Sequence, residues 1–322
     1  LLNKKNEIYG SGNLILEKEQ FKLKGKFESE KIRLDEILDT ISYLKFKKDD
    51  VYLVSVAKSQ LDLDLGFEFK KLIFGESNFT NVSSKILSKG QDFIIKDFKA
   101  NYEETLIKSD AIYKNKKSIL KGKLYIFDFL VNKELSKKMK LSLNDANFDC
   151  DMDFVFNKQT KSIKLLDKLH VTGDCSAPKA MLVGISVDKT IDKIDNLQTF
   201  QDFFNLFKKN EMGGTTKIDS ISFTFSLKNG ILKIKDSLAS QKNLKIKSIG
   251  NFSVYENKVN FKNQIFVKTK KFENLPSFNV MIAGPKNDYK VSYDFAELKS
   301  SVLSNGINSL LKKQKKIVID PN

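Results

Sequence analysis

Hydrophobic and polar residues alternate with a period of two along most of the chain. Between residues 221 and 227 the apolar side chains fall on one side and Ser or Thr on the other, as in a strand with one buried and one solvent-facing side. The dipeptide Asn229-Gly230 follows and supplies the two positive φ angles of a type I′ turn. The alternation then resumes at Leu232, so this stretch predicts a β-hairpin.

The same alternation predicts strands throughout the chain. They are expected at residues 14–16, 21–27, 61–69, 78–87, 93–102, 107–113, 119–129, 141–156, 244–249, 252–255, 259–267, 278–282 and 289–295. Only four prolines interrupt the chain, which suits long sheets whose backbone N–H groups are all needed for pairing. The fold class we predict is mainly β, a long antiparallel meander.

Three segments space their apolar residues for one face of a helix instead. They cover about residues 35–46, 188–209 and 296–313. Asp294 stands before the third segment with Glu297 three residues later, as in a capping box. We therefore expect about three amphipathic helices, including one near the C-terminus, that cover part of an apolar core.

Strands with one apolar face must hide that face, because burying a Phe or Ile side chain is worth about 1.5–3 kcal/mol. The predicted helices are few for so many strands, so part of the face is expected to lack a protein cover. Curled into a trough, such a face would suit acyl chains. The alternative is a closed sandwich filled by the chain's 26 phenylalanines, and periodicity does not separate the two. The side chains that would line either interior in the C-terminal part are Ile221, Phe223, Phe225, Leu227, Leu232, Ile234, Leu244, Ile246, Phe252, Val254, Val259 and Phe261.

The order of these elements resembles the AsmA family of bacterial envelope proteins. The C-terminal third carries the closest resemblance: Gly184-Ile185-Ser186-Val187-Asp188 before a helix, Gly213-Gly214-Thr215-Thr216, the Asn-Gly hairpin, and the segment 275–285 that ends in Gly284-Pro285 ahead of Asp294. Upstream, Leu61-Asp62-Leu63-Asp64-Leu65 followed by Gly75 and Gly90 is similar to a recurrent unit of the family. The resemblance divides the chain into an AsmA-like β-repeat region at 1–180, an AsmA-like C-terminal region at 181–313 and a basic or polar tail at 314–322.

The resemblance implies a curved, groove-like sheet shaped like a taco, with a hydrophobic interior. It also implies a location in the periplasm of a Gram-negative bacterium, anchored to the inner membrane by an N-terminal helix that this chain does not contain. Its implied partners are phospholipid, the membrane and outer-membrane assembly proteins. The chain starts without methionine inside the strand pattern, so we expect a fragment that lacks a targeting segment.

The charge changes this interpretation little. The net charge is +16, which alone would favour phosphate-bearing partners. Arg33, however, is the only arginine among 56 basic residues, and arginine is preferred for bidentate contacts to guanine and phosphate. We therefore expect no nucleic-acid partner and keep a cationic binder of anionic lipid surfaces as an alternative.

No catalytic, metal or cofactor site is expected. His170 is the only histidine, and its position in a predicted strand favours a structural role. The aspartates at 62 and 64 and at 149, 151 and 153 fall on one side of their strands without a calcium-binding loop, so we interpret them as solvent-facing. Cys150 and Cys175 have no metal-site spacing, and we favour two ordinary free thiols over the alternative, a disulfide between them. The leading hypothesis is a non-catalytic envelope protein that binds or conducts phospholipid, and the second is a closed scaffold.

Overall fold

The computed structural model of the chain describes residues 8–17, 20–34, 61–89, 92–130, 142–184, 186–187, 189, 191–192, 214–268, 276–294, 296–297, 300–301 and 304. It divides into two compact units. The first unit comprises residues 1–130 and 148–173, and the second comprises residues 131–147 and 174–322. The described strands belong to a large, open mixed sheet and to a three-stranded sheet, so the mainly β prediction is confirmed.

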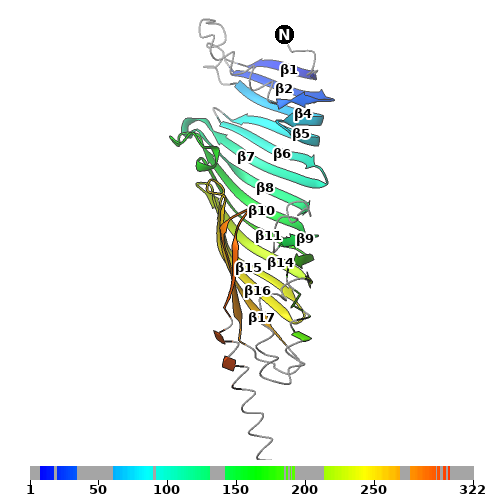
Figure 1. Cartoon of the computed structure of the whole chain (residues 1–322). Helices are drawn as coiled ribbons and strands as arrows, with labels where there is room; N and C mark the ends of the chain where they lie inside the picture. The colour runs from blue at the N-terminus through cyan, green and yellow to red at the C-terminus, as the bar shows by residue number, and fades with distance from the viewer. Residues whose placement is uncertain are drawn as a thin grey trace, which may run out of the picture. The chain divides into compact units, whose positions relative to one another are not determined.

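Successive strands lie side by side in the first unit (Figure 1). Their order is β1-β2-β4-β5-β6-β7-β8-β10-β11, with β3 beside β4. Two single-turn 3₁₀ helices, Asn115–Lys117 and Leu165–Asp167, lie in connections between these strands. The strand bounds are β1 (Tyr9–Glu17), β2 (Gln20–Ser29), β3 (Ile32–Arg33), β4 (Leu61–Phe74), β5 (Ser77–Lys89), β6 (Asp92–Tyr102), β7 (Thr105–Lys114), β8 (Ile119–Leu130), β10 (Asn147–Asn157) and β11 (Leu169–Ala177).

The prediction of a wholly antiparallel meander is wrong at the start of the chain. β4 pairs with both β2 and β3 in parallel. Parallel neighbours need a crossover of a dozen residues or more, and the chain between Arg33 and Leu61 is long enough to make one. The pairs from β4 to β8 are antiparallel, as expected.

The sheet of the first unit has an apolar and a charged side. Parallel pairing sets Phe27 of β2 beside Phe67 of β4, with ring centroids 5.4 Å apart. On the opposite side Lys26 bonds both Glu28 and Glu68 at 2.9 Å. The alternation seen in the sequence therefore becomes two chemically distinct sheet faces.

Residues with positive φ interrupt three strands of this unit. Asn81, Asp97 and Asp128 have φ of 51°, 53° and 57°. The backbone N–H of Asp97 donates to Oδ1 of Asp110 at 2.9 Å, and that of Asp128 donates to Oδ1 of Asp149 at 3.0 Å. The strand register shifts near Asn81 and Asp97, as at β-bulges, which increase the local twist of a strand.

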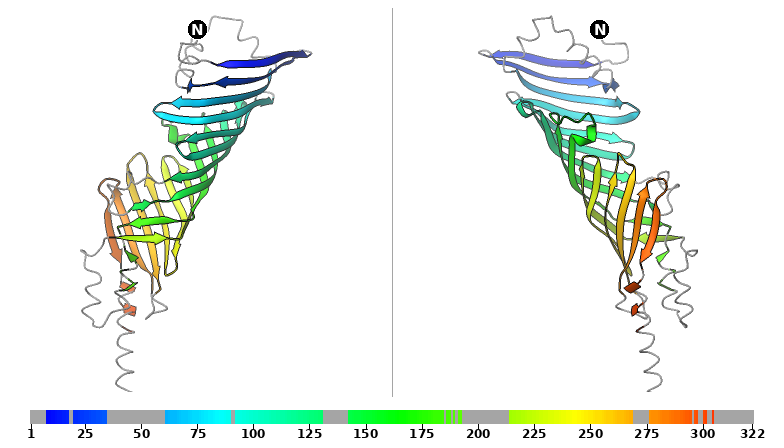
Figure 2. Two further views of the ribbon diagram at one scale, coloured as in Figure 1. Left: turned by 90° about the vertical axis from the view of Figure 1, so that its right-hand side faces the viewer. Right: turned by 60° about the vertical axis from the view of Figure 1, so that its left-hand side comes forward.

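The second unit contains an antiparallel sheet and a smaller one. The strands β14 to β18 lie side by side, from yellow to orange in Figure 2, and β19 follows β18. The small sheet has the order β13-β12-β9. The strand bounds are β9 (Ser142–Asn144), β12 (Ala180–Val183), β13 (Thr215–Ile218), β14 (Ser220–Lys228), β15 (Ile231–Gln241), β16 (Leu244–Ser253), β17 (Lys258–Val267), β18 (Phe278–Pro285) and β19 (Lys290–Asp294).

The predicted hairpin between β14 and β15 is confirmed. Lys228 pairs with Ile231, and the two turn residues Asn229 and Gly230 have φ of 52° and 70°. These positive angles are those that a type I′ turn requires.

Two predicted strand boundaries are wrong. Residues 141–156 form two strands in different sheets, β9 and β10, and Asp145 between them has a φ of 53°. The alternation hides this break because Asp145 reverses the chain without interrupting the hydrophobic pattern. In the other direction, residues 244–255 were expected as two strands, but β16 runs without a break from Leu244 to Ser253.

The three predicted helices lie mostly outside the described residues. Within the described part, Leu34, Val187, Ile191 and Ala296 are helical. Oδ1 of Asp294 accepts a hydrogen bond from the N–H of Ala296 at 3.1 Å, as the predicted cap requires. Among the described residues, no helix combines the length and the hydropathy needed to span a membrane. The basic tail at 314–322 also lies outside the described residues.

The interpretation of the cysteines as free thiols is wrong. The chain has two cysteines, and both Cys150 of β10 and Cys175 of β11 are disulfide-bonded, so they bond each other. Gly173 of β11 lies opposite Met152 of β10. The two backbones are so close there that a Cβ built on Gly173 would lie 3.0 Å from the Met152 Cα. Two residues further along, the antiparallel register places the cysteines opposite each other. Strand register thus determines the pairing, and sequence spacing does not reveal it.

Candidate functional site

Most of the side chains predicted to line the interior lie on one face of the second unit's sheet. Phe225 pairs with Ile234, Ile246 with Ile265, and Phe252 with Val259, so the apolar positions of neighbouring strands coincide. Val254 follows the last residue of β16 and is 40% exposed. The predicted residues that belong to β14, β15, β16 and β17 are therefore brought together on one face, and they are Ile221, Phe223, Phe225, Leu227, Leu232, Ile234, Leu244, Ile246, Phe252, Val259 and Phe261. Val254 lies in the turn beyond β16 and is not part of this face.

A β-bulge in β15 keeps this face continuous. The register with both neighbouring strands shifts between Ile234 and Leu238, because β15 has one residue more than either neighbour there. Beyond the bulge, Ser237 and Ala239 are partly buried, while Asp236 and Leu238 are exposed. The extra residue thus moves the odd-numbered positions onto the face that Leu232 and Ile234 occupy.

One end of the face is closed. Leu244 is 1% exposed, Ile265 2% and Val267 6%, which are values typical of a packed core. The small sheet covers this end, because Leu143 of β9, Leu182 of β12 and Ile218 of β13 line one hollow together with β14 to β18. We call the side chains of the large sheet at this end the covered rows. They are Ile221, Ala239, Gln241, Leu244, Ile246, Ile265, Val267 and Phe278.

The other end of the face is more accessible. Its apolar side chains are only partly buried, although they lie on the same strands as the covered rows. In the register they form two cross-strand rows, from β14 across to β18. We call them the open rows, and they comprise Phe225, Ile234, Gly250, Phe261 and Ile282, then Leu227, Leu232, Phe252, Val259 and Gly284.

A polar row separates the covered rows from the open rows. It contains Ser237, Ser248 and Asn263, between Phe223 on β14 and Val280 on β18. The hydroxyl of Ser248 donates to Oδ1 of Asn263 at 2.7 Å, and the Asn263 amide donates to the Val280 carbonyl at 3.1 Å. Sequence reasoning missed this row because it followed only apolar positions. Counting by two from Ile246 reaches Ser248, and counting by two from Phe261 reaches Asn263, so the signal was present.

The covered rows and the small sheet leave a hollow of about 180 Å³. Its lining is mostly aliphatic, with Ile221, Ile246 and Ile265 on one side and Leu143, Leu182 and Ile218 on the other. Ser237, Ser248 and Asn263 of the polar row also line it. A mostly apolar concave site with a few placed polar groups is the common form of a small-molecule pocket.

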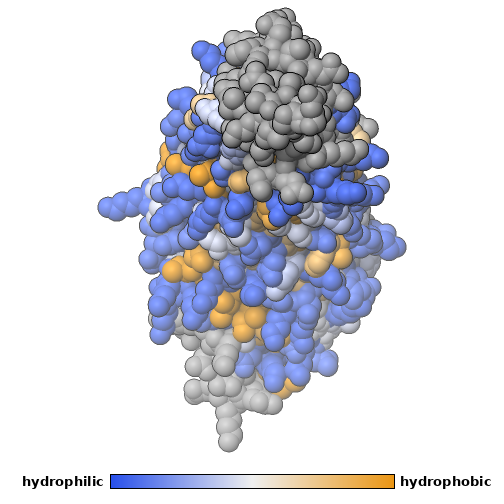
Figure 3. Space-filling view, turned by 90° about the horizontal axis from the view of Figure 1, so that it is seen from below, coloured by the Kyte–Doolittle hydropathy of each residue, from blue (hydrophilic) through white to orange (hydrophobic). Residues whose placement is uncertain are grey.

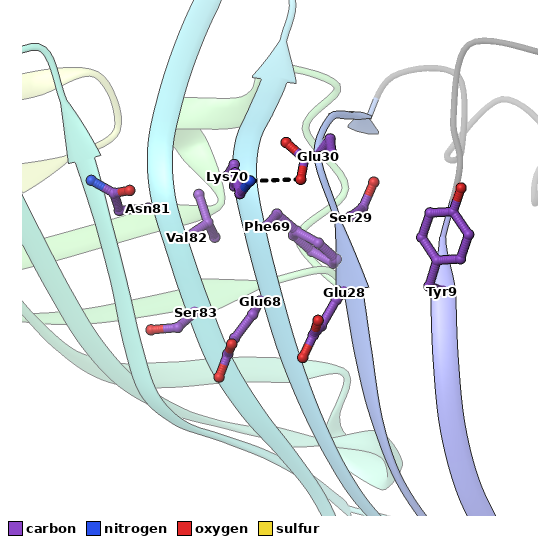
Figure 4. A pocket seen from close by; sticks show the side chains of 10 residues that line it. All are labelled: Tyr9, Glu28, Ser29, Glu30, Glu68, Phe69, Lys70, Asn81, Val82 and Ser83. Carbon is purple, nitrogen blue, oxygen red and sulfur yellow. Dashed lines mark ion pairs between the residues drawn. The ribbon is translucent and has the colours of Figure 1, made fainter.

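A second hollow, of about 430 Å³, lies beside β1, β2, β4 and β5 of the first unit (Figure 4). Glu28, Glu30 and Glu68 line it, and Nζ of Lys70 bonds Glu30 at 2.7 Å. Hydrogen bonds with Glu28 and then Glu68 raise the pKa of the neighbouring Lys26 above its ordinary value. The carboxylates that line this second hollow are thus partly neutralised by lysines. The hollow also lacks the mostly aliphatic lining of the hollow in the second unit.

A third hollow, of about 670 Å³, lies on the charged side of β6, β7, β8 and β10. Lys96, Lys121 and Lys123 line it with Asp110 and Asp153. The charges of both signs are interspersed, as on an ordinary solvent-facing sheet. This mixture gives it no single-sign field for binding an ion.

The remaining candidate residues are not brought into a site. His170 is exposed on β11, and the aspartates 149, 151 and 153 are exposed along β10. Asp64 bonds Lys85 at 3.0 Å across the sheet. Within the described part of the chain, no group of acidic, His or Cys side chains is arranged to hold a metal ion. The face visible in Figure 3 is mostly hydrophilic, with hydrophobic side chains gathered in small separate patches.

Comparisons with protein-family models, with curated proteins and with solved structures return no match to this chain.

Proposed function

We propose that this chain is a non-catalytic, AsmA-like envelope protein that holds phospholipid acyl chains on the open rows of its second unit. The proposal includes a curved, groove-like sheet along which the lipid passes between the inner and the outer membrane. It also includes outer-membrane assembly proteins as partners and attachment to the inner membrane by a helix outside this chain.

The partial cover of the apolar face is the observation that supports this proposal most directly. Phe225, Phe261 and Phe252 lie in adjacent rows of one sheet, and each is only partly buried. Water contact with such a surface costs about 25 cal/mol per Å² of apolar area. An acyl chain on these rows would remove that cost without any change in the fold.

The disulfide supports a location outside the cytoplasm. Cys150 and Cys175 are joined, and disulfides persist in oxidising compartments such as the bacterial periplasm. Trapping of thiols with a bulky maleimide in intact cells, followed by electrophoresis without reductant, measures the redox state. We expect no modification before reduction and modification at both cysteines after it. Modification before reduction would contradict the periplasmic location.

Lipid extraction from the protein purified out of a Gram-negative host tests the lipid-binding proposal. Mass spectrometry is expected to find phospholipid in a fixed molar ratio to the protein. The double variant Phe225→Ser/Phe261→Ser is expected to reduce this ratio at least about tenfold, since each substitution removes a large apolar contact.

The control places a substitution of an apolar residue by serine on the opposite face of β16. Ile249 is 54% exposed on β16, next to Gly250 of the open rows. Ile249→Ser is expected to leave the lipid ratio unchanged. Equal losses in both variants would show non-specific adsorption.

The same extraction separates the two alternatives. A lipid-free protein with normal folding would favour the closed scaffold, for which the buried covered rows provide the basis. Binding only to vesicles of anionic lipid, with affinity that falls steeply as salt rises, would favour a cationic surface binder.

A further inference from the structure

We propose that the hollow beneath the small sheet receives the methyl end of a single acyl chain, whose headgroup remains at the turns beyond the open rows. This proposal rests on the proposed function and adds to it an orientation and a limit on chain length.

The size of the hollow fits the end of a hydrocarbon chain. Its volume is about 180 Å³, and cavities of about 150 Å³ lined by Leu, Ile and Phe stay dry and bind benzene. Aliphatic side chains from both sheets provide most of its lining. A segment of about six carbon atoms therefore fits, and a charged headgroup would have no partner for its charge there.

The hollow borders the open rows at the polar row. Ser248 and Asn263 line the hollow, and the next positions along the same strands and face are Gly250 and Phe261. The Ser248 hydroxyl already donates to the Asn263 side-chain oxygen, and the Asn263 amide nitrogen already donates to the Val280 carbonyl. An acyl chain can therefore cross this row without leaving those polar atoms unpaired.

The length of the path matches one acyl chain. From Ile265 at the hollow to Val259 in the outer open row the strand advances by about 20 Å, at about 3.4 Å per residue. A bilayer has a hydrocarbon core of about 30 Å, so an acyl chain with its usual bends reaches about 15 Å there. The path of about 20 Å therefore corresponds to one acyl chain in an extended form. The Phe261 ring lies close against Gly250, since a Cβ at this position would come within 2.5 Å of the ring, so the ring itself lines this path.

The turns at the far end suit a headgroup. Lys228 is exposed where β14 ends, and Lys286 lies in the turn after β18. Lys258, at the start of β17, already pairs with Glu256 at 3.2 Å, so Lys228 and Lys286 are the cations for a headgroup. Val254 and Tyr255, 40% and 42% exposed, stand at the same end. Cationic side chains beside an amphipathic aromatic ring are the chemistry that an interfacial phosphate and glycerol require.

Photolabelling of the full chain tests the orientation. Two phosphatidylglycerol probes are compared, one with a diazirine at the methyl end of a sixteen-carbon chain and one with the diazirine next to the ester. The methyl-end probe is expected to label peptides that contain Leu182, Ile218 or Ala239. The ester-end probe is expected to label peptides that contain Ile231 or Tyr255. The reverse pattern, or the same pattern with both probes, overturns the inference.

A variant that fills the hollow tests the limit on chain length. Ala239 lines the hollow, and Ala239→Leu is expected to reduce affinity for the sixteen-carbon lipid about tenfold, the equivalent of about two buried methylene groups. A ten-carbon lipid is expected to lose less than about twofold. Ala283→Leu, on the exposed side of β18, is the matched control and is expected to change neither affinity.

The results distinguish this inference from the proposed function. Labelling confined to the open rows with both probes, or equal loss of both lipids in Ala239→Leu, overturns the inference and leaves lipid binding intact. An absence of competable labelling with either probe overturns both. The photolabelling uses the unsubstituted chain, so it decides the question even where Ala239→Leu does not fold.

Discussion

The covered rows and the open rows lie on the same strands of one sheet, but only the covered rows form a closed core. Leu244 and Phe252 are both apolar residues of β16, and eight positions separate them. Leu244 is 1% exposed at the closed end of the face, whereas Phe252 is only partly buried. The difference arises from the second layer, since the strand supplies the same kind of side chain at both positions. The sandwich and the uncovered sheet are thus two parts of one face.

The covered rows are expected to carry most of the unit's stability. Leu244→Ala leaves a cavity at the closed end of the face and is expected to lower the free energy of unfolding by about 2–5 kcal/mol. Urea unfolding followed by circular dichroism measures this change. A loss below about 1 kcal/mol would show that the covered rows are not a packed core.

Gly250 tests how closely the open rows pack on themselves. A Cβ at this position would lie 2.7 Å from the Phe261 Cα and would also crowd the Asn260 carbonyl oxygen. Gly250→Val is therefore expected to lower the free energy of unfolding by about 2–3 kcal/mol and to displace the Phe261 ring. The control Ile249→Val, on the exposed side, is expected to stay within about 0.5 kcal/mol of the parent chain. Equal stability of Gly250→Val and the parent would mean that β16 and β17 separate more easily than their register indicates.

The polar row is expected to contribute less. Asn263→Ala removes the acceptor for Ser248 and the donor to the Val280 carbonyl. The expected loss is about 1–2 kcal/mol, because the Ser248 hydroxyl and the Val280 carbonyl each lose a hydrogen bond. Ser237→Ala is the comparison, in the same row and hollow, and is expected to cost less. Chemical denaturation of the two variants in parallel decides the order.

The smallest effect on stability is expected in the open rows. Phe252→Ala removes a partly buried ring, and the expected loss is about 1 kcal/mol, less than the cost for a fully buried side chain. Lipid binding is expected to fall in this variant far more than stability does. A loss equal to that of Leu244→Ala would show that Phe252 belongs to the closed core.

The alternation of the sequence predicted most of the long strands and the composition of the apolar face, but β3, β12 and β13 were not among the expected strands. The positions from Ile221 to Phe261 fell on one side because strand geometry depends mainly on local order. Long-range features were missed, among them the parallel pairing of β2 with β4 and the cover of Ile246 by β9, β12 and β13. These depend on which distant strands meet, as does the pairing of Cys150 with Cys175. Ser248 and Asn263 were missed for a different reason, since polar residues were assigned to the outside without following the alternation through them.

The additional residue in β15 has a consequence for comparing this chain with others. The alternation of inward and outward side chains in β15 shifts by one residue between Ile234 and Leu238. The two halves of the strand therefore point their apolar side chains to the same face only when this additional residue is present. A related sequence that is one residue shorter there would turn either the Leu232 half or the Ala239 half outward. Such a sequence would have to exchange lysines for aliphatic residues throughout that half. In an alignment, a one-residue deletion at this point of β15 would therefore be accompanied by an exchange of apolar and polar positions in one half of the strand.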